Sequence, residues 1–282
     1  MPAEKLKPDL TRLRPEAEAE PGSLVAEVEA LSIGTDPDKE KATKILRRLA
    51  GEYQHKRHIE DALGVEPLIG LVRDGNDVLK EEAAGALNNL SFKNDETKRQ
   101  IVDKGGIEPL VALAKGGKED QRTQAAGALR NVASLAQGQK PIADAGGIAA
   151  MVSILKDTKA KESEIDMATG TLLGLSVDMD NKTKIADAQC LLDLVHLVRV
   201  GTDNQKELAA GVLLKLAAVA NNTTQIREAG ALDPLLELVR AGSPALKEVG
   251  ANALWALSSN DPSGRIKMVI EMAGGIEPRC AP

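Results

Sequence analysis

Aromatic residues are scarce in this sequence, whose 282 residues include one Trp, one Tyr and one Phe. A domain of this size usually buries several rings, because each ring fills a large volume with one rigid side chain. Leu, Ala, Val and Ile must therefore fill the interior, which favours thin layers of small side chains. Sites that stack nucleic acid bases or enclose methyl-lysine need several rings, so the composition argues against both.

Cysteine and positive charge are also limited. Cys190 and Cys280 are too few for a disulfide framework or a four-ligand zinc site, which favours a reducing compartment. With 36 basic and 42 acidic residues, the net charge of -6 repels nucleic acid. The sequence has no apolar signal segment or long apolar run, and Pro2 excludes a Met-Gly acylation site. We expect no nucleic acid partner, no direct membrane insertion, and a cytoplasmic location that extends to the nucleus.

The chain repeats itself with a period of about 42 residues. A Leu within an Ala-rich stretch recurs at intervals of 41, 42, 43, 41 and 41 residues, namely Leu46, Leu87, Leu129, Leu172, Leu213 and Leu254. Segments similar to Gly-Ile-Glu-Pro-Leu recur in step with it, starting at Gly64, Gly106, Gly147, Cys190, Ala231 and Gly275. Two series with the same spacing predict a repeat architecture.

One unit predicts three helices, over residues 95–104, 107–115 and 119–134, of which the last is the longest. Glycine pairs separate them, and Gly suits the position that follows a helix. In the longest helix, Ala125, Ala128, Leu129 and Val132 follow the spacing of one helical face. So small a unit cannot bury its apolar faces alone, and stacking of neighbouring units buries them. The predicted fold class is therefore an all-α solenoid.

Residues 105–113 (Gly-Gly-Ile-Glu-Pro-Leu-Val-Ala-Leu) and 125–133 (Ala-Ala-Gly-Ala-Leu-Arg-Asn-Val-Ala) resemble the armadillo repeat. The resemblance implies a right-handed superhelical solenoid of three-helix repeats. It also implies a non-enzymatic scaffold whose long helices line a concave groove that binds an extended peptide. The expected organisation is a flexible polar tail (1–22), a degenerate capping repeat (23–63) with Lys41–Ala50 in place of its long helix, five repeats (64–274) and a truncated further repeat (275–282).

The resemblance also indicates where a partner would bind. Two residues after the recurring Leu, armadillo proteins carry asparagines that bind peptide backbone, and this column reads Arg48, Asn89, Asn131, Gly174, Lys215 and Ala256. Four residues earlier, nuclear-import adapters of this fold carry tryptophans, where this chain has Lys44, Gly85, Gly127, Gly170, Gly211 and Asn252. The missing tryptophans argue against a receptor for nuclear-localisation signals.

We therefore expect the partner-binding residues Arg48, Asn89, Asn131, Lys215 and Trp255. The first three predict a polar, mildly cationic end of the groove that faces acidic partner residues. An aliphatic end is expected around Lys215, formed by Leu208, Val219, Val249 and Ala256. The alternative is that some of these residues are ordinary solvated helix positions. Trp255 has two interpretations, as a binding anchor or as a cover for the truncated end.

No catalytic or cofactor motif occurs, so we expect no enzyme activity and no cofactor. His55 and His58 are three residues apart, but no third ligand lies near them in the sequence, so no metal site is expected. Gln189 and Cys190 replace the glycine pair of other repeats, which predicts either an altered turn or a cost of about 1 kcal/mol. Cys190 is interpreted as a passive substitution, with a redox-sensitive thiol as the alternative.

Further expectations concern alternative functions and the C-terminal end of the repeats. The scaffold has a functional alternative, as the substrate- or cargo-selecting armadillo domain of a larger enzyme such as a ubiquitin ligase. An adapter attached to a membrane is disfavoured by the absence of an acylation signal. The truncated last repeat predicts an exposed apolar face around Leu254, Leu257 and Val269, through which the protein would self-associate.

Overall fold

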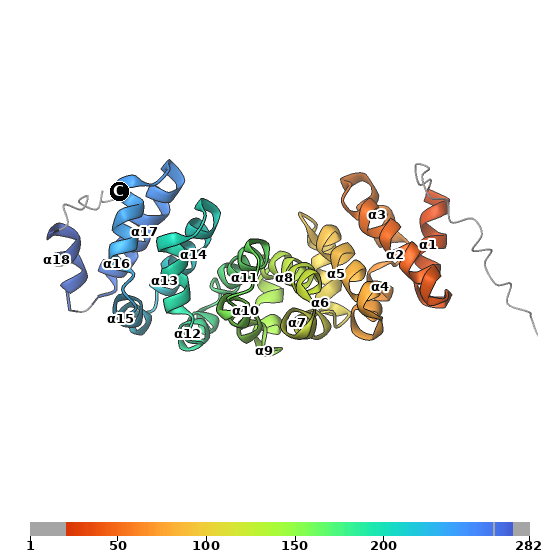
Figure 1. The fold of residues 1–282 in the computed structure, drawn as a ribbon, viewed down its shortest axis with the longest axis horizontal. Helices are drawn as coiled ribbons and strands as arrows, with labels where there is room; N and C mark the ends of the chain where they lie inside the picture. Colours follow the sequence, from red (N-terminus) through yellow and green to blue (C-terminus); the bar gives the residue numbers. More distant parts are fainter. Residues whose placement is uncertain (1–20, 262, 273–282) are drawn as a thin grey trace, which may run out of the picture. The chain divides into compact units, whose positions relative to one another are not determined.

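The computed structural model describes residues 21–261 and 263–272, and over these residues it contains 18 helices and no strand. The chain divides into two compact units between Gly138 and Gln139 (Figure 1). The expected truncated repeat (275–282) and nearly all of the expected tail lie outside the described residues.

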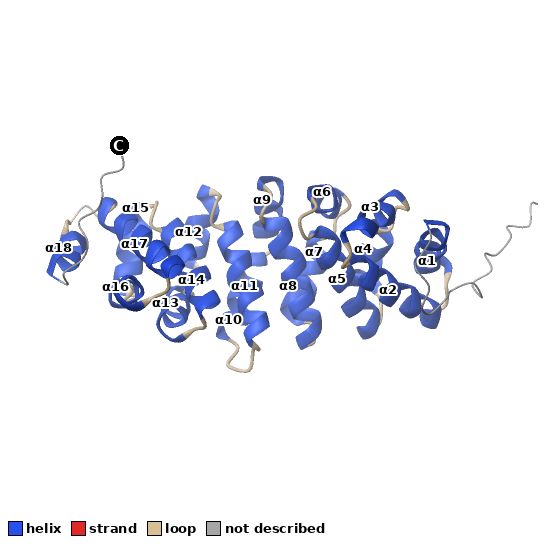
Figure 2. Ribbon diagram, turned by 90° about the horizontal axis from the view of Figure 1, so that it is seen from above, coloured by secondary structure: helices blue, strands red, loops and turns tan. Residues whose placement is uncertain are grey.

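The first unit begins with two helices and then repeats the order short, medium, long. Its helices are α1 (Pro21–Ile33), α2 (Asp36–Ala50), α3 (Tyr53–Asp61), α4 (Val65–Asp74), α5 (Asp77–Ser91), α6 (Asp95–Asp103), α7 (Ile107–Gly116) and α8 (Glu119–Ala133). The long helices α2, α5 and α8 pack side by side in this order (Figure 2). Helices α6, α7 and α8 confirm the three predicted helices, with ends that differ by one residue.

The second unit repeats the same order of helices. It contains α10 (Gly147–Lys156), α11 (Glu162–Leu175), α12 (Met179–Asp187), α13 (Leu191–Val200), α14 (Asp203–Leu216), α15 (Ala220–Glu228), α16 (Leu232–Ala241), α17 (Pro244–Ser259) and α18 (Arg265–Met272). The division between the units falls within α9 (Ala136–Asp144). Here the long helices α11, α14 and α17 are neighbours.

The core consists of aliphatic side chains from every layer, as the composition predicted. The recurring leucines are buried: Leu46, Leu87, Leu129, Leu172 and Leu213 are 0% exposed and Leu254 is 5% exposed. None of the three aromatic residues belongs to this core. Tyr53 is 80% exposed, Trp255 58% and Phe92 55%. The few rings of this chain are therefore surface residues.

The capping repeat has a complete long helix, which corrects the prediction that only Lys41–Ala50 stands in its place. Helix α2 starts at Asp36, because Thr35 caps it. The Thr35 hydroxyl donates to the Asp38 carboxylate at 2.6 Å, and its backbone N–H donates to the same oxygen at 3.1 Å. These hydrogen bonds lower the pKa of Asp38 and hold the first helical turn. Helix α1 starts at Pro21, two residues before the expected start of this repeat.

The predicted apolar face near the C-terminus is wrong for two of its three residues. Leu254 is 5% exposed and Leu257 is 0% exposed, whereas Val269 is 38% exposed. Helix α18 contacts α17. Burial of these leucines removes the observation on which the expected self-association rested.

The turn at Gln189 keeps the geometry of the other repeats, so the predicted alternative of an altered turn is wrong. Gln189 has φ +58°, and the glycines at the equivalent positions, Gly105, Gly146 and Gly230, have φ of +68°, +84° and +80°. This left-handed conformation costs a residue with a Cβ atom free energy that glycine does not lose. The native state therefore carries the conformational cost of the left-handed Gln189.

Replacing Gln189 by Gly is expected to raise the free energy of unfolding by about 1 kcal/mol, because it removes this cost. Urea unfolding followed by circular dichroism measures the change. Gln189→Ala is the matched control, since it removes the same side chain atoms but keeps the Cβ, and it should give no gain. Equal stability of the Gly and Ala variants would show that the turn is unstrained.

Candidate functional site

Three of the expected partner-binding residues lie in the first unit, near the C-terminal ends of adjacent long helices. Arg48 is exposed on α2, whereas Asn89 on α5 and Asn131 on α8 are half-buried. Lys215 and Trp255 are exposed on α14 and α17 of the second unit. The structure thus brings Arg48, Asn89 and Asn131 to one surface, which we call the long-helix face of the first unit.

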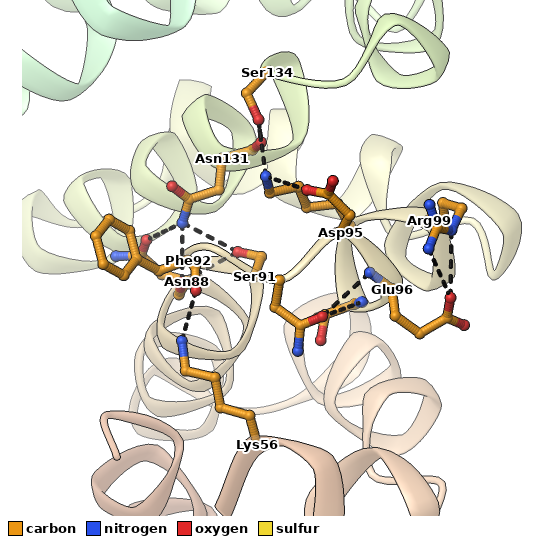
Figure 3. A network of polar contacts seen from close by, with 12 residues as sticks. Lys56, Asn88, Ser91, Phe92, Asp95, Glu96, Arg99, Asn131 and Ser134 are labelled. Atoms are coloured by element: carbon orange, nitrogen blue, oxygen red, sulfur yellow. Dashed lines mark hydrogen bonds and ion pairs between the residues drawn. The ribbon is translucent and has the colours of Figure 1, made fainter. Parts of the chain in front are cut away.

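The two asparagines hold adjacent long helices together. The Asn89 Nδ2 atom donates to the backbone oxygen of Arg47 at 3.0 Å. The Asn131 Nδ2 atom donates to the backbone oxygen of Asn88 at 3.0 Å, to Asn88 Oδ1 at 3.1 Å and to Ser91 Oγ at 3.1 Å (Figure 3). Among the described residues, no group donates to the Oδ1 atom of either asparagine. The carboxamides therefore offer a partner an acceptor, while the Nδ2 atom of each already donates to the preceding long helix.

Side chains of the preceding repeat explain the glycines at Gly85, Gly127 and Gly211. Asn88 lies across Gly127, where a Cβ atom would be 2.6 Å from Asn88 Nδ2, and Arg47 lies across Gly85 in the same way. In the second unit, a Cβ atom at Gly211 would be 3.2 Å from Leu173 Cδ1. Glycine at Gly85, Gly127 and Gly211 thus leaves room for a side chain of the neighbouring long helix.

Positive charge on the long-helix face is concentrated on α2. Lys44 and Arg48 are exposed and four residues apart, which places them on one side of the helix. Neither has a carboxylate partner among the described residues. Arg47, in contrast, pairs with Glu82 at 3.1 Å and with Glu81 at 3.8 Å. The polar, mildly cationic character predicted for this end thus has a specific source in Lys44 and Arg48.

The aliphatic end expected in the second unit does not form as predicted. Leu208 and Ala256 are 8% and 7% exposed and belong to the core. Val219 lies beyond the end of α14, at the start of α15, and Val249 is half-buried on α17. Trp255, at 58% exposed, is the large exposed apolar side chain of the long helices α11, α14 and α17.

Cys190 confirms the passive interpretation. It is 0% exposed, and its Sγ atom donates to the backbone oxygen of Ile185 at 3.4 Å. Burial raises the pKa of the thiol to about 11, so it stays protonated and unreactive at neutral pH. The rings of His55 and His58 are 6.4 Å apart, and His55 contacts Glu52 at 3.3 Å.

Within the described part of the chain, no group of three or more His, Cys, Asp or Glu residues is arranged to bind a metal ion. No helix there is long and apolar enough to cross a membrane.

The armadillo/beta-catenin-like repeat model matches residues 94–134, which span α6, α7 and α8. A designed armadillo repeat protein solved in complex with the peptide (KR)4 is also similar in structure. It shares 23% identity over 83% of this chain and 99% of its own, with a TM-score of 0.75. Residues 94–134 therefore form an armadillo repeat, and the described chain has the armadillo solenoid fold.

Other solved armadillo-like structures match over similar lengths. Two engineered proteins from the Northeast Structural Genomics Consortium share 28% and 27% identity with this armadillo protein. The first covers 90% of this chain and 62% of its own, with a TM-score of 0.83. The second covers 84% and 97%, with a TM-score of 0.78. No curated protein sequence matches.

Three functional or structural residues of this armadillo protein escaped sequence reasoning. Arg47 and Asn88 each precede a glycine of the next repeat, Gly85 and Gly127, and this pairing of a bulky side chain with a later glycine was a usable signal. Lys56 gave no signal, because a lysine on a short polar helix is normally solvated. It is 5% exposed, and its Nζ atom donates to the backbone oxygens of Asn89 at 2.6 Å and Phe92 at 2.7 Å (Figure 3). Burial lowers the pKa of Lys56.

Proposed function

We propose that this armadillo protein is a non-enzymatic interaction scaffold, an adapter that binds an extended peptide segment on the long-helix face of the first unit. The observation that carries the proposal is the pair of carboxamides at the repeat spacing, Asn89 and Asn131. Hydrogen bonds to the preceding helix fix each side chain, and the Oδ1 atom remains available to accept a peptide N–H. Fixed acceptors bind well because little side-chain entropy is lost on binding.

The charge of the face suggests which peptide binds. Lys44 and Arg48 lack carboxylate partners among the described residues, and both are exposed next to the carboxamides. They favour acidic side chains in the partner, because opposite charges across an interface increase the association rate and select the partner. The peptide (KR)4 of the designed armadillo protein is basic, so we propose the opposite preference for this chain. Lys215 and Trp255 are the proposed contacts of the second unit.

Charge reversal on α2 tests the proposal. An array of extended peptides identifies an acidic ligand, and fluorescence anisotropy measures its Kd. Lys44→Glu combined with Arg48→Glu is expected to weaken binding by about tenfold or more, because two attractive contacts become repulsive. Lys115→Glu is the matched control, since Lys115 is exposed on α7, away from this face.

The melting temperature should stay nearly unchanged in all three proteins, because the replaced residues are exposed. An unchanged Kd in the double variant would refute binding of an acidic peptide at this face. The emission of Trp255, the single tryptophan of the chain, reports in the same titration whether the partner also covers the second unit.

A further inference from the structure

A second concave surface lies at the short-helix edge of the first unit. It is a cleft of about 850 Å³ between α3 and the segment that joins α5 to α6, including the first turns of α6. Its lining includes Tyr53, Arg57, Glu60, Lys93, Asn94 and Glu96. The volume falls in the range of about 300–1,000 Å³ that is typical of ligand sites. The long helices do not contribute to its lining, so this cleft is separate from the long-helix face.

Two of the three aromatic rings of the chain lie at this cleft. Tyr53 lines it with 80% of its surface exposed. Phe92 adjoins it, because the Nζ atoms of two lining residues, Lys56 and Lys93, lie 5.6 Å and 5.4 Å from the centre of its ring. Exposed rings forgo burial of a large apolar area, and aromatic residues are enriched among those that dominate binding energy. Their placement here therefore indicates a contact surface.

The base of the cleft is fixed by internal hydrogen bonds. Lys56 holds the end of α5 through the backbone oxygens of Asn89 and Phe92. Glu60 accepts hydrogen bonds from the Thr97 hydroxyl and, at 2.7 Å, from Asn94 Nδ2. Since Asn94 also caps α6, these contacts tie α3 to both neighbouring segments. A surface that is ordered in advance loses less entropy on binding.

The charges that remain at the cleft favour an anionic partner. Three of its four carboxylates interact with cations of the first unit: Glu60 with the Lys56 ammonium, Asp95 with Lys98 at 2.8 Å, and Glu96 with Arg99 at 3.1 Å. Asp61 has no such partner among the described residues. Neither Arg57 nor Lys93 has a carboxylate partner there. Arg57 is one helical turn from Tyr53, so a cation and an exposed ring lie on one face of α3.

We propose that this cleft is a second peptide-binding site, which takes a segment that pairs an acidic side chain with an aromatic or aliphatic one. The apolar side chain packs on Tyr53 and Phe92, and the carboxylate pairs with Arg57 and Lys93. The site is separate from the one proposed on the long-helix face. A scaffold with two such sites can bind two segments of one partner, or two partners, at once.

Single aromatic residues make the test specific to this cleft. Tyr53 is the only tyrosine, Phe92 the only phenylalanine and Trp255 the only tryptophan. Incorporation of fluorotyrosine, fluorophenylalanine or fluorotryptophan into the full chain therefore gives one fluorine NMR resonance for each position. The probe is the acetylated peptide Ser-Glu-Glu-Leu-Phe-Glu-Glu-Ser, and the control peptide carries Lys in place of each Glu.

The acidic probe is expected to shift the Tyr53 and Phe92 resonances with the same Kd, and the basic control is expected to leave them unchanged. Arg57→Glu combined with Lys93→Glu should raise this Kd by about tenfold or more. Lys44→Glu combined with Arg48→Glu should leave it unchanged, which separates this cleft from the long-helix face. Circular dichroism verifies that the variants are folded.

The proposal is overturned if neither resonance moves at saturating probe, if the basic peptide binds equally well, or if the Arg57 and Lys93 replacements leave the Kd unchanged. A Tyr53 shift that disappears only in the Lys44 and Arg48 variant would also overturn it, because binding would then belong to the long-helix face.

Discussion

Replacing Gly127 by Leu is expected to lower the free energy of unfolding by about 2–5 kcal/mol, although Leu forms helices better than Gly. A Cβ atom at this position would lie 2.6 Å from Asn88 Nδ2 and 2.9 Å from Asn88 Oδ1. Asn88 would have to move, and its Oδ1 atom and backbone oxygen are both acceptors for Asn131. The new side chain therefore disrupts both the packing and the hydrogen bonds between α5 and α8.

Gly70→Ala is the matched control for this prediction. Gly70 lies within α4 of the same unit, and no heavy atom lies within 4 Å of the place where its Cβ would be. Ala should raise the free energy of unfolding by about 0.5–1 kcal/mol, because it loses less backbone entropy on folding. Urea unfolding followed by circular dichroism measures both variants. A Gly127→Leu variant as stable as the wild type would show that Asn88 yields without loss.

The repeat period predicted the fold because burial imposes it. The leucine that recurs about every 42 residues is the buried centre of each long helix, so its spacing reports the stacking directly. The glycine pairs predicted the helix ends, because they mark where the chain leaves a helix. The leucine spacing and the glycine pairs can both be read from a single sequence, because they depend only on residue type and position.

The sequence missed the start of α2, and at Gln189 it left two outcomes open, for local reasons of a different kind. Thr35 and Asp38 form a capping pair, but Pro37 and the charged residues around them resemble a loop. At Gln189, the fold holds the backbone at φ +58°, against the preference of the residue. Tertiary structure thus overrode the local preference, and the strain is visible only in the backbone.

The sequence predicted only part of the candidate sites, because contacts between side chains of neighbouring repeats cannot be read from one repeat alone. The repeat spacing placed Arg48, Asn89 and Asn131 at equivalent positions of adjacent long helices, but the hydrogen bonds of the two asparagines depend on the neighbouring helix. The cleft at the short-helix edge was missed altogether. Tyr53 and Phe92 are 39 positions apart and stand in different elements, so only the fold brings them to one surface.

Replacing Asn131 by Asp is expected to lower the free energy of unfolding by about 2–3 kcal/mol at neutral pH. The two side chains have nearly the same shape, but a carboxylate cannot donate. Asn131 Nδ2 contacts three oxygen atoms, on the backbone and side chain of Asn88 and on Ser91. The Ser91 hydroxyl already donates to the backbone oxygen of Asn88. A carboxylate at position 131 would therefore face three oxygen atoms, none of which donates a hydrogen bond to it.

The loss should depend on pH in a direction that identifies its cause. Surrounding acceptors disfavour the charged carboxylate in the folded protein, so the pKa of the introduced group is raised above its unfolded value. Its penalty is then present above the folded pKa and declines as pH falls through it, because the protonated acid can donate again. The difference in unfolding free energy between wild type and variant, measured at several pH values from neutral to acidic, should therefore shrink as the pH falls. A difference that is constant with pH would show that shape, rather than the lost donor, destabilises the variant.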